Sequence, residues 1–218
     1  MNTTVPTTAL IDWISRFRDQ IANRRDWLTE LDSAIGDADH GANMARGMDA
    51  VVAKLAEQGS APTADAVLKA VGMTLVSSVG GASGPLYGTF FLRMGMTAGA
   101  VTELDGPALA AALRAGLDGV IARGKAQAGD KTMLDAMIPA IDALDDRLSG
   151  GGELSEAVAA AASAAEQGRD ETLPLVARKG RASYLGERSA GHLDPGAAST
   201  ALLFAALSAA LAAATDAA

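Results

Sequence analysis

Residues 31–47, LDSAIGDADHGANMARG, form an acidic turn between two stretches of helical periodicity. The apolar stripe before the turn consists of Leu10, Trp13, Ile14, Phe17 and Ile21, and it continues to Leu28 and Leu31. A second stripe follows the turn and ends near Gly59, so the sequence predicts a helix that begins inside DADHG. The turn therefore joins two helices and concentrates acidic side chains at their junction.

Helical periodicity continues along the rest of the chain, with turn signals at intervals of roughly 20 to 30 residues. Further helices are predicted to follow Thr63, Gly80–Pro85, Gly106–Pro107, Gly129–Lys131, the triple glycine at 150–152 and Pro195. Residues 173–195 are predicted to form a long polar loop, and no segment has the alternation typical of a strand. Eight helices joined by short turns predict an all-α bundle that forms a single domain over residues 1–218.

The composition argues against several classes of protein. A formal net charge of −8 is unlike the basic surface of a nucleic-acid binder, and the lack of cysteine excludes disulfides and thiolate metal sites. The first residues, MNTTVPTTALIDW, have neither the basic nor the apolar region of an export signal, so we expect a cytoplasmic protein. Two uncharged stretches, 71–92 and 195–215, are interrupted by glycine and proline or dominated by small residues. We predict buried helices there and no membrane span.

Three aspartates in the opening turn are candidates for a metal site. Asp32, Asp37 and Asp39 offer hard carboxylate oxygens, which suit Mg²⁺ rather than zinc, and Gly36 lets the backbone turn between them. A helix N-terminus beside such a cluster would also present free N–H groups to a phosphate. The alternative is that these aspartates simply cap the following helix. Their spacing leaves both interpretations open.

Two further segments are candidates for binding an anion. In SSVGGASGPLYGTF, residues 77–90, the glycines and Ser83 precede a proline at a predicted helix start, a backbone that could hold an anion or merely turn tightly. The long polar loop contains the densest basic cluster, Arg178, Lys179, Arg181 and Arg188. It could close over a nucleotide, or it could be a solvated charge run. The two histidines, His40 and His192, each lie in a candidate segment, and neither belongs to a recognisable catalytic triad.

Four segments together resemble the signature blocks of the DhaL family, the nucleotide-binding subunits of dihydroxyacetone kinase. In order, they are IGDADHGANMARG (35–47), SSVGGASGPLYGTFF (77–91), GKAQAGDKTM (124–133) and ARKGRASYLGERSAGHLDPGA (177–197). The resemblance covers essentially the whole chain. It implies an eight-helix up-and-down antiparallel barrel with a nucleotide, ADP or ATP, at one rim.

The resemblance also implies roles for individual residues. Asp32, Asp37 and Asp39 match the ligands of two Mg²⁺ ions that bridge to the nucleotide's phosphates. The positions that match nucleotide contacts are His40, Gly41, Ala42, Asn43, Ala82, Ser83, Gly124, Met133, Arg181, Asp194, Pro195 and Gly196. No side chain of this chain is expected to carry the phosphoryl group covalently, because phosphoryl transfer depends mainly on positioning and charge neutralisation.

Partners follow from the same resemblance. In the family, dihydroxyacetone is held by a separate subunit, DhaK, and ADP is phosphorylated in place by the phosphohistidine protein DhaM. The stand-alone form of this module favours that arrangement. Two alternatives stay open: an ATP-dependent module of a dihydroxyacetone or tetrulose kinase with exchangeable nucleotide, and a nucleotide-sensing module that docks on a transcriptional regulator. A purely structural helical bundle would leave the polar loops unexplained.

Overall fold

The computed structural model describes residues 4–57, 59 and 62–216, and nearly all regular structure within them is helical. The α-helices are α1 (Thr7–Asn23), α2 (Arg25–Ile35), α3 (His40–Ala56), α4 (Ala64–Ser78), α5 (Ser83–Ala98), α6 (Gly106–Gly124), α7 (Leu134–Ser149), α8 (Leu154–Glu171) and α9 (Pro195–Asp216). A 3₁₀ helix, η1, spans Arg181–Ser189. The predicted all-helical class is confirmed.

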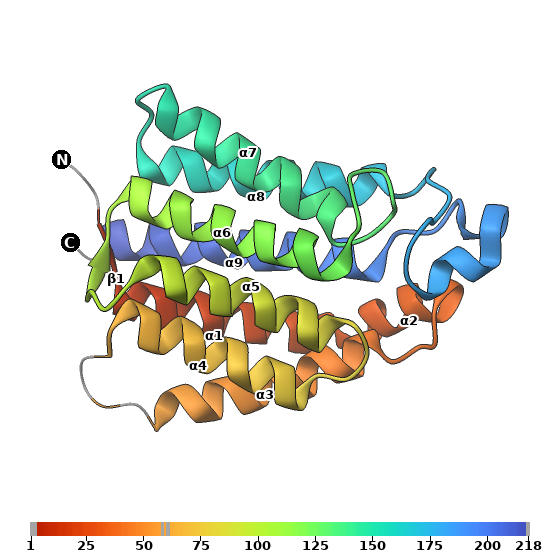
Figure 1. Cartoon of the computed structure of the whole chain (residues 1–218), viewed down its shortest axis with the longest axis horizontal. Coiled ribbons are helices and arrows are strands. Elements are labelled where there is room, and N and C mark those ends of the chain that lie inside the picture. Colours follow the sequence, from red (N-terminus) through yellow and green to blue (C-terminus); the bar gives the residue numbers. More distant parts are fainter. Residues whose placement is uncertain (1–3, 58, 60–61, 217–218) are drawn as a thin grey trace.

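Within the described residues, the eight α-helices other than α2 have at least 15 residues each. They run alternately in opposite directions along the molecule (Figure 1). From α3 to α9, each helix packs on the next, and α1 contacts both α3 and α9. The helices α3, α5, α7 and α9 therefore all begin at the same end of the molecule, where α2 and η1 also lie (Figure 1). The fold thus brings four helix N-termini to one end.

Aromatic and small residues fill the core along these helices. The rings of Trp13, Phe91 and Phe90 form a chain with centroid distances of 5.6 and 5.2 Å. The Trp13 indole N–H donates to the carbonyl of Leu203 over 2.9 Å, which satisfies its polar atom inside the core and ties α1 to α9. The close packing of α4 on α5 depends on glycine, because a Cβ at Gly72 would lie 2.8 Å from the carbonyl oxygen of Gly88.

Three predictions about elements were wrong in detail. The first predicted helix is broken at Arg24, so α2 is a separate helix that packs on the start of α3. The contact is at Gly41, where a Cβ would lie 2.0 Å from the carbonyl oxygen of Arg25. A continuous helix would instead have carried the acidic turn beyond the end of the bundle.

The second and third differences concern short elements. Residues 181–189 of the predicted polar loop form η1, which is kinked at Gly186, where φ is +56°. Two strands of two residues, β1 (Val5–Pro6) and β2 (Glu103–Leu104), pair antiparallel at the end opposite η1. Strands this short leave no alternation in the sequence.

The helix α9 is the one described helix that is long and apolar enough to cross a membrane, with a mean hydropathy of 1.9 over its most apolar part. It is 61% buried there and packs against α1, α7 and α8. This burial is typical of a core helix. Residues 1–3, which begin the N-terminal stretch considered for an export signal, lie outside the described residues.

Candidate functional site

The acidic turn between α2 and α3 brings three carboxylates together. Asp32 is buried in the last turn of α2, whereas Asp37 and Asp39 are exposed in the turn itself. One carboxylate oxygen from each lies within 4.8 Å of the others. Between the two exposed aspartates, Ala38 has a φ of +62°, a conformation that costs a non-glycine residue of the order of 1 kcal/mol. The backbone is therefore held in an unfavourable conformation where the acidic groups converge.

The structure shows a helix cap at one aspartate of this cluster and leaves the other carboxylate oxygens available for a metal. The Asp32 oxygen Oδ2 accepts hydrogen bonds from the backbone N–H of Asp39 (2.8 Å) and His40 (3.1 Å), so Asp32 caps α3 from the preceding helix. Asp39, which occupies the N-cap position, makes no side-chain cap hydrogen bond. The carboxylates of Asp37 and Asp39 and the second oxygen of Asp32 are therefore not used for capping. This set of hard oxygen donors fits Mg²⁺.

The four helix starts enclose a cavity of about 200 Å³ beside this cluster. Its wall includes the first turns or preceding residues of α3, α5, α7 and α9, and residues 179–182. Backbone N–H groups at helix N-termini point outward and carry a partial positive charge, so they favour a negatively charged ligand. The cavity is thus acidic on one wall and electropositive on the others, which suits a metal-bound phosphate.

A hydrogen-bonded chain of side chains lies beneath this cavity. The His40 ring contacts Ser199 Oγ through Nε2 (2.9 Å) and Ser83 Oγ through Nδ1 (3.2 Å). Tyr87 Oη lies 2.8 Å from Ser199 Oγ and 3.0 Å from Thr200 Oγ1. Burial lowers the pKa of His40, partly offset by Asp32 and Asp39, and burial raises the pKa of Tyr87 to about 12. Burial therefore favours the neutral form of both side chains, which join the starts of α3, α5 and α9.

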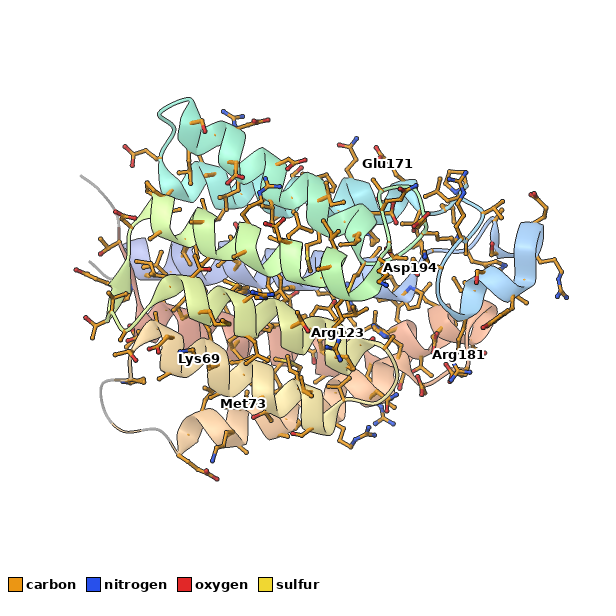
Figure 2. The ribbon with its side chains drawn as sticks, viewed as in Figure 1. Lys69, Met73, Arg123, Glu171, Arg181 and Asp194 are labelled. Atoms are coloured by element: carbon orange, nitrogen blue, oxygen red, sulfur yellow. The ribbon has the colours of Figure 1, made fainter. Side chains whose placement is uncertain are left out.

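A second, mostly apolar cavity of about 310 Å³ adjoins the first. The two share a wall made by Ala82, Leu86, Thr132, Met133, Lys179 and Gly180. Gly124 lies in the second cavity, and Arg123 lies beside it at the end of α6 (Figure 2). An apolar cleft beside an anion site can accept the flat ring system of a nucleoside.

Residues 173–194, here called the closing loop, cover the mouth of the first cavity. The buried ammonium of Lys131 donates to the backbone carbonyls of Thr172 (2.9 Å), Leu175 (3.0 Å) and His192, which fixes both ends of the loop to the start of α7. Further out, Arg181 Nη2 lies 3.0 Å from Asp37 Oδ2. Figure 2 places Arg181 beside α2 and Asp194 where α9 begins.

Asp194 ends the closing loop and caps α9. Its Oδ2 accepts from the N–H of Ala197 over 2.7 Å, and its own N–H donates to Thr172 Oγ1 over 3.0 Å. Burial raises its pKa to about 7, and Asp135 adds to this effect, whereas the N–H of Ala197 and the charge of Lys131 act against it. This carboxyl therefore titrates in the neutral pH range.

The structure places most of the candidate residues at the two cavities. The first cavity is lined by Asp32, Asp37, Asp39, His40, Asn43, Ala82, Ser83, Met133, Arg181, Asp194, Pro195 and Gly196. The second is lined by Ala82, Met133 and Gly124. Gly41 and Ala42 line neither cavity, and the Cα of Gly41 packs on α2. Of the basic cluster, Lys179 and Arg181 line the first cavity, whereas Arg178 and Arg188 do not.

Sequence reasoning assigned no role to Lys131, Tyr87 or Ser199 in the site. The burial of Lys131 and the contact between Tyr87 and Ser199 depend on how distant segments meet, so no local pattern reveals them. One signal was available for Lys131, since it directly follows Gly129–Asp130 at a predicted helix start.

Comparison with known proteins agrees with this arrangement. Residues 34–209 match the model of the DAK2 domain. The chain is 48% identical over 192 residues to the ADP-binding subunit DhaL of the PEP-dependent dihydroxyacetone kinase of Escherichia coli K12, covering 88% of this chain and 91% of that protein. The chain belongs to the DhaL family. The DhaL subunit of the PTS-dependent enzyme of Lactococcus lactis is 45% identical, with 92% of this chain and 95% of that protein covered.

More distant members carry the DhaL-like region within longer chains. The L-erythrulose kinase of Pectobacterium atrosepticum is 36% identical over 89% of this chain but only 33% of its own length. The crystal structure of the dihydroxyacetone kinase of C. freundii with AMP-PNP and Mg²⁺ is 27% identical, with a TM-score of 0.69, and covers 91% of this chain and 33% of that one. One third of the C. freundii enzyme therefore shares the fold of this chain.

Proposed function

We propose that this chain is the nucleotide-binding subunit of a PEP-dependent dihydroxyacetone kinase. Bound with Mg²⁺, its ADP would relay a phosphoryl group from a DhaM-like phosphohistidine protein to dihydroxyacetone on a DhaK-like subunit. The observation that carries the proposal is the convergence of three carboxylates and four helix N-termini on one cavity. Phosphoryl transfer requires this kind of charge neutralisation more than covalent chemistry from the protein.

Different residues of the site would bind different parts of the nucleotide. Asp32, Asp37 and Asp39 would hold two Mg²⁺ ions. His40, Asn43, Ala82 and Ser83 would face the phosphates, and Gly41 and Ala42 would contribute only the backbone at the start of α3. Gly124 and Met133 would contact the nucleoside, and the nucleotide would be covered by Arg181 of the closing loop and by Asp194–Pro195–Gly196, where the loop joins α9. The carboxylate oxygens within 4.8 Å and the adjoining apolar cavity support this division.

We assign no covalent carrier in this chain. Both ring nitrogens of His40 are engaged by serine hydroxyls, and burial lowers its pKa, so we infer that His40 is a structural link. His192 does not line the cavity. The protein's contribution is then to orient donors at the phosphates and to exclude water from them.

The barrel arrangement, the cellular location and the regulatory partner are also inferences. We infer that the eight long helices close into an up-and-down barrel, which is supported by the packing of α9 on both α8 and α1. A cytoplasmic location and a nucleotide-dependent contact with a transcriptional regulator are proposals that rest on family resemblance. The higher identity to DhaL subunits (45–48%) than to the fused kinase of P. atrosepticum (36%) favours the phosphohistidine-driven branch over the ATP-dependent one.

The test is the nucleotide content of protein purified without added nucleotide. The protein is dialysed extensively and denatured with acid, and the released nucleotide and magnesium are quantified, with Asp37→Asn as the control variant. Near-stoichiometric ADP in the wild type and little in Asp37→Asn would support a resident cofactor. Empty protein that binds ATP reversibly would favour the ATP-dependent branch, and a protein that binds neither nucleotide nor Mg²⁺ would refute the proposal.

A further inference from the structure

Arg46 joins the first cavity to the end of a neighbouring helix. It lies on α3, and its Nη2 donates to Asn43 Oδ1 over 2.7 Å, one turn earlier on the same helix. Its Nε donates to the carbonyl of Ser78 over 3.3 Å, at the last residue of α4. A cation at the carbonyl end of a helix is electrostatically favourable, so α4 holds the guanidinium in place.

The Asn43 amide is confined on its other side by the glycine turn before α5. A Cβ at Gly80 would lie 3.0 Å from Asn43 Nδ2 and 3.1 Å from Oδ1, so the amide plane lies directly against the Gly80 backbone. Asn43 is 9% exposed and lines the first cavity. Its Nδ2 makes no hydrogen bond to any residue that the structure describes. The amide group therefore has one occupied end and one end free for a ligand.

The chemistry of the guanidinium decides which end is free. Arginine has only donors, so Arg46 donates to the amide oxygen of Asn43 and cannot form a hydrogen bond with its amide nitrogen. With Oδ1 turned to Arg46, the Nδ2 hydrogens are the part of the amide that a ligand in the cavity can meet. An amide rotated by 180° would present its oxygen to the ligand, and this oxygen would repel a phosphate.

We propose that Arg46 is a positioning residue, which fixes the Asn43 amide so that Asn43 is a hydrogen-bond donor to the nucleotide's phosphates. Arg46 does not line either cavity and acts through Asn43. This inference rests on the proposed function, because it explains how the same nucleotide site presents hydrogen-bond donors to the phosphates.

The test is a double-mutant cycle read out by calorimetric binding of Mg-ADP to nucleotide-stripped protein. The four proteins are the wild type, Arg46→Met, Asn43→Ala and the double variant. When Asn43 is intact, we expect Arg46→Met to weaken Mg-ADP binding about tenfold, which is the effect of losing one hydrogen bond to a charged group. In the Asn43→Ala background we expect Arg46→Met to change the affinity less than about twofold, because no amide is left to orient. Lys54→Met, which removes an exposed cation from the same helix, is the matched control.

A second variant separates orientation from simple contact with Arg46. Asn43→Asp preserves an oxygen for the guanidinium but places a second oxygen where the proposal puts N–H groups. We expect it to bind Mg-ADP more weakly than Asn43→Ala does, whereas a purely structural link would make the aspartate the milder change. Thermal unfolding of each nucleotide-free variant checks that it is folded.

The outcomes separate the two proposals. Wild-type protein that fails to bind Mg-ADP overturns the proposed function and this inference with it. Wild-type binding combined with equal effects of Arg46→Met in both backgrounds, or with Asn43→Asp binding better than Asn43→Ala, overturns only the inference.

Discussion

Arg181 Nη2 lies 3.0 Å from Asp37 Oδ2, so a cation of the closing loop is paired with one of the three clustered carboxylates. Beneath this pair, Ile35 at the end of α2 packs with Ala177 and Ala182 of the loop, and Leu185 packs against this small cluster. The closing loop thus lies on the acidic turn through one ion pair and one apolar contact. Any group that binds the three carboxylates must share Asp37 with Arg181.

The first prediction concerns Arg181→Gln. The Arg181 side chain is 68% exposed, and an exposed ion pair contributes no more than about 1 kcal/mol, so the variant should unfold at nearly the wild-type urea concentration. If Arg181 closes over a phosphate, Mg-ADP binding should weaken about tenfold through the loss of a charge-assisted hydrogen bond. Urea unfolding and calorimetry measure the two effects. A large loss of stability with unchanged affinity would show that Arg181 only fastens the loop.

The second prediction separates two aspartates of the same cluster. Asp32→Ala removes the cap of two backbone N–H groups at the start of α3, so the free energy of unfolding should fall by about 1–2 kcal/mol. Asp37→Ala removes only an exposed ion pair, and the free energy of unfolding should change by about 0.5 kcal/mol or less. Both variants should lose Mg²⁺-dependent ADP binding. Equal stability losses would contradict the capping role of Asp32, and unchanged Mg²⁺ dependence would contradict the metal site.

Local sequence signals were sufficient for most of the helices. The apolar stripe of α1, the start of α3 within DADHG and the α6 start at Gly106–Pro107 follow from periodicity and capping chemistry, which act over a few residues. The break at Arg24 could not be predicted in this way, because no glycine or proline marks it. We attribute the break to the packing of α2 on Gly41. Tertiary contact overrides local preference at such points.

Some residues of the candidate site could be predicted from the sequence and others could not. Aspartates and glycines in one turn stand out in the sequence, and the structure places Asp32, Asp37 and Asp39 together. Lys131 does not stand out, since a lysine beside a turn is ordinarily solvated, and only the fold shows it buried against the carbonyls of Thr172 and His192. Arg46 likewise gains its role from the distant Ser78.

The third prediction concerns pH. Burial raises the pKa of Asp194 from 3.8 to about 7, so the folded protein binds this proton more tightly than the unfolded chain does. The stability that this group contributes is therefore fully present below pH 4 and is lost as the pH rises through 7. Asp194→Asn keeps an oxygen for the Ala197 N–H and removes the titration. Relative to Asp194→Asn, the wild type should become steadily less stable between about pH 4 and pH 7, with no further change above pH 8. Urea unfolding at each pH tests this, and parallel curves for the two proteins would contradict it.

The fourth prediction is that Lys131 holds the closing loop in place. Lys131→Met keeps much of the side-chain volume but leaves the carbonyls of Thr172, Leu175 and His192 without their shared donor inside the protein. The contact with Thr172 is buried and the other two are partly buried, so the free energy of unfolding should fall by about 2 kcal/mol. With its ends released, the loop should also be cut faster by trypsin at its basic residues.

Lys125→Met is the matched control, because Lys125 also has a positive φ in the same connection but is exposed. Urea unfolding and the rate of tryptic cleavage measure the two effects. Equal behaviour of the two variants would mean that the buried ammonium does not secure the loop.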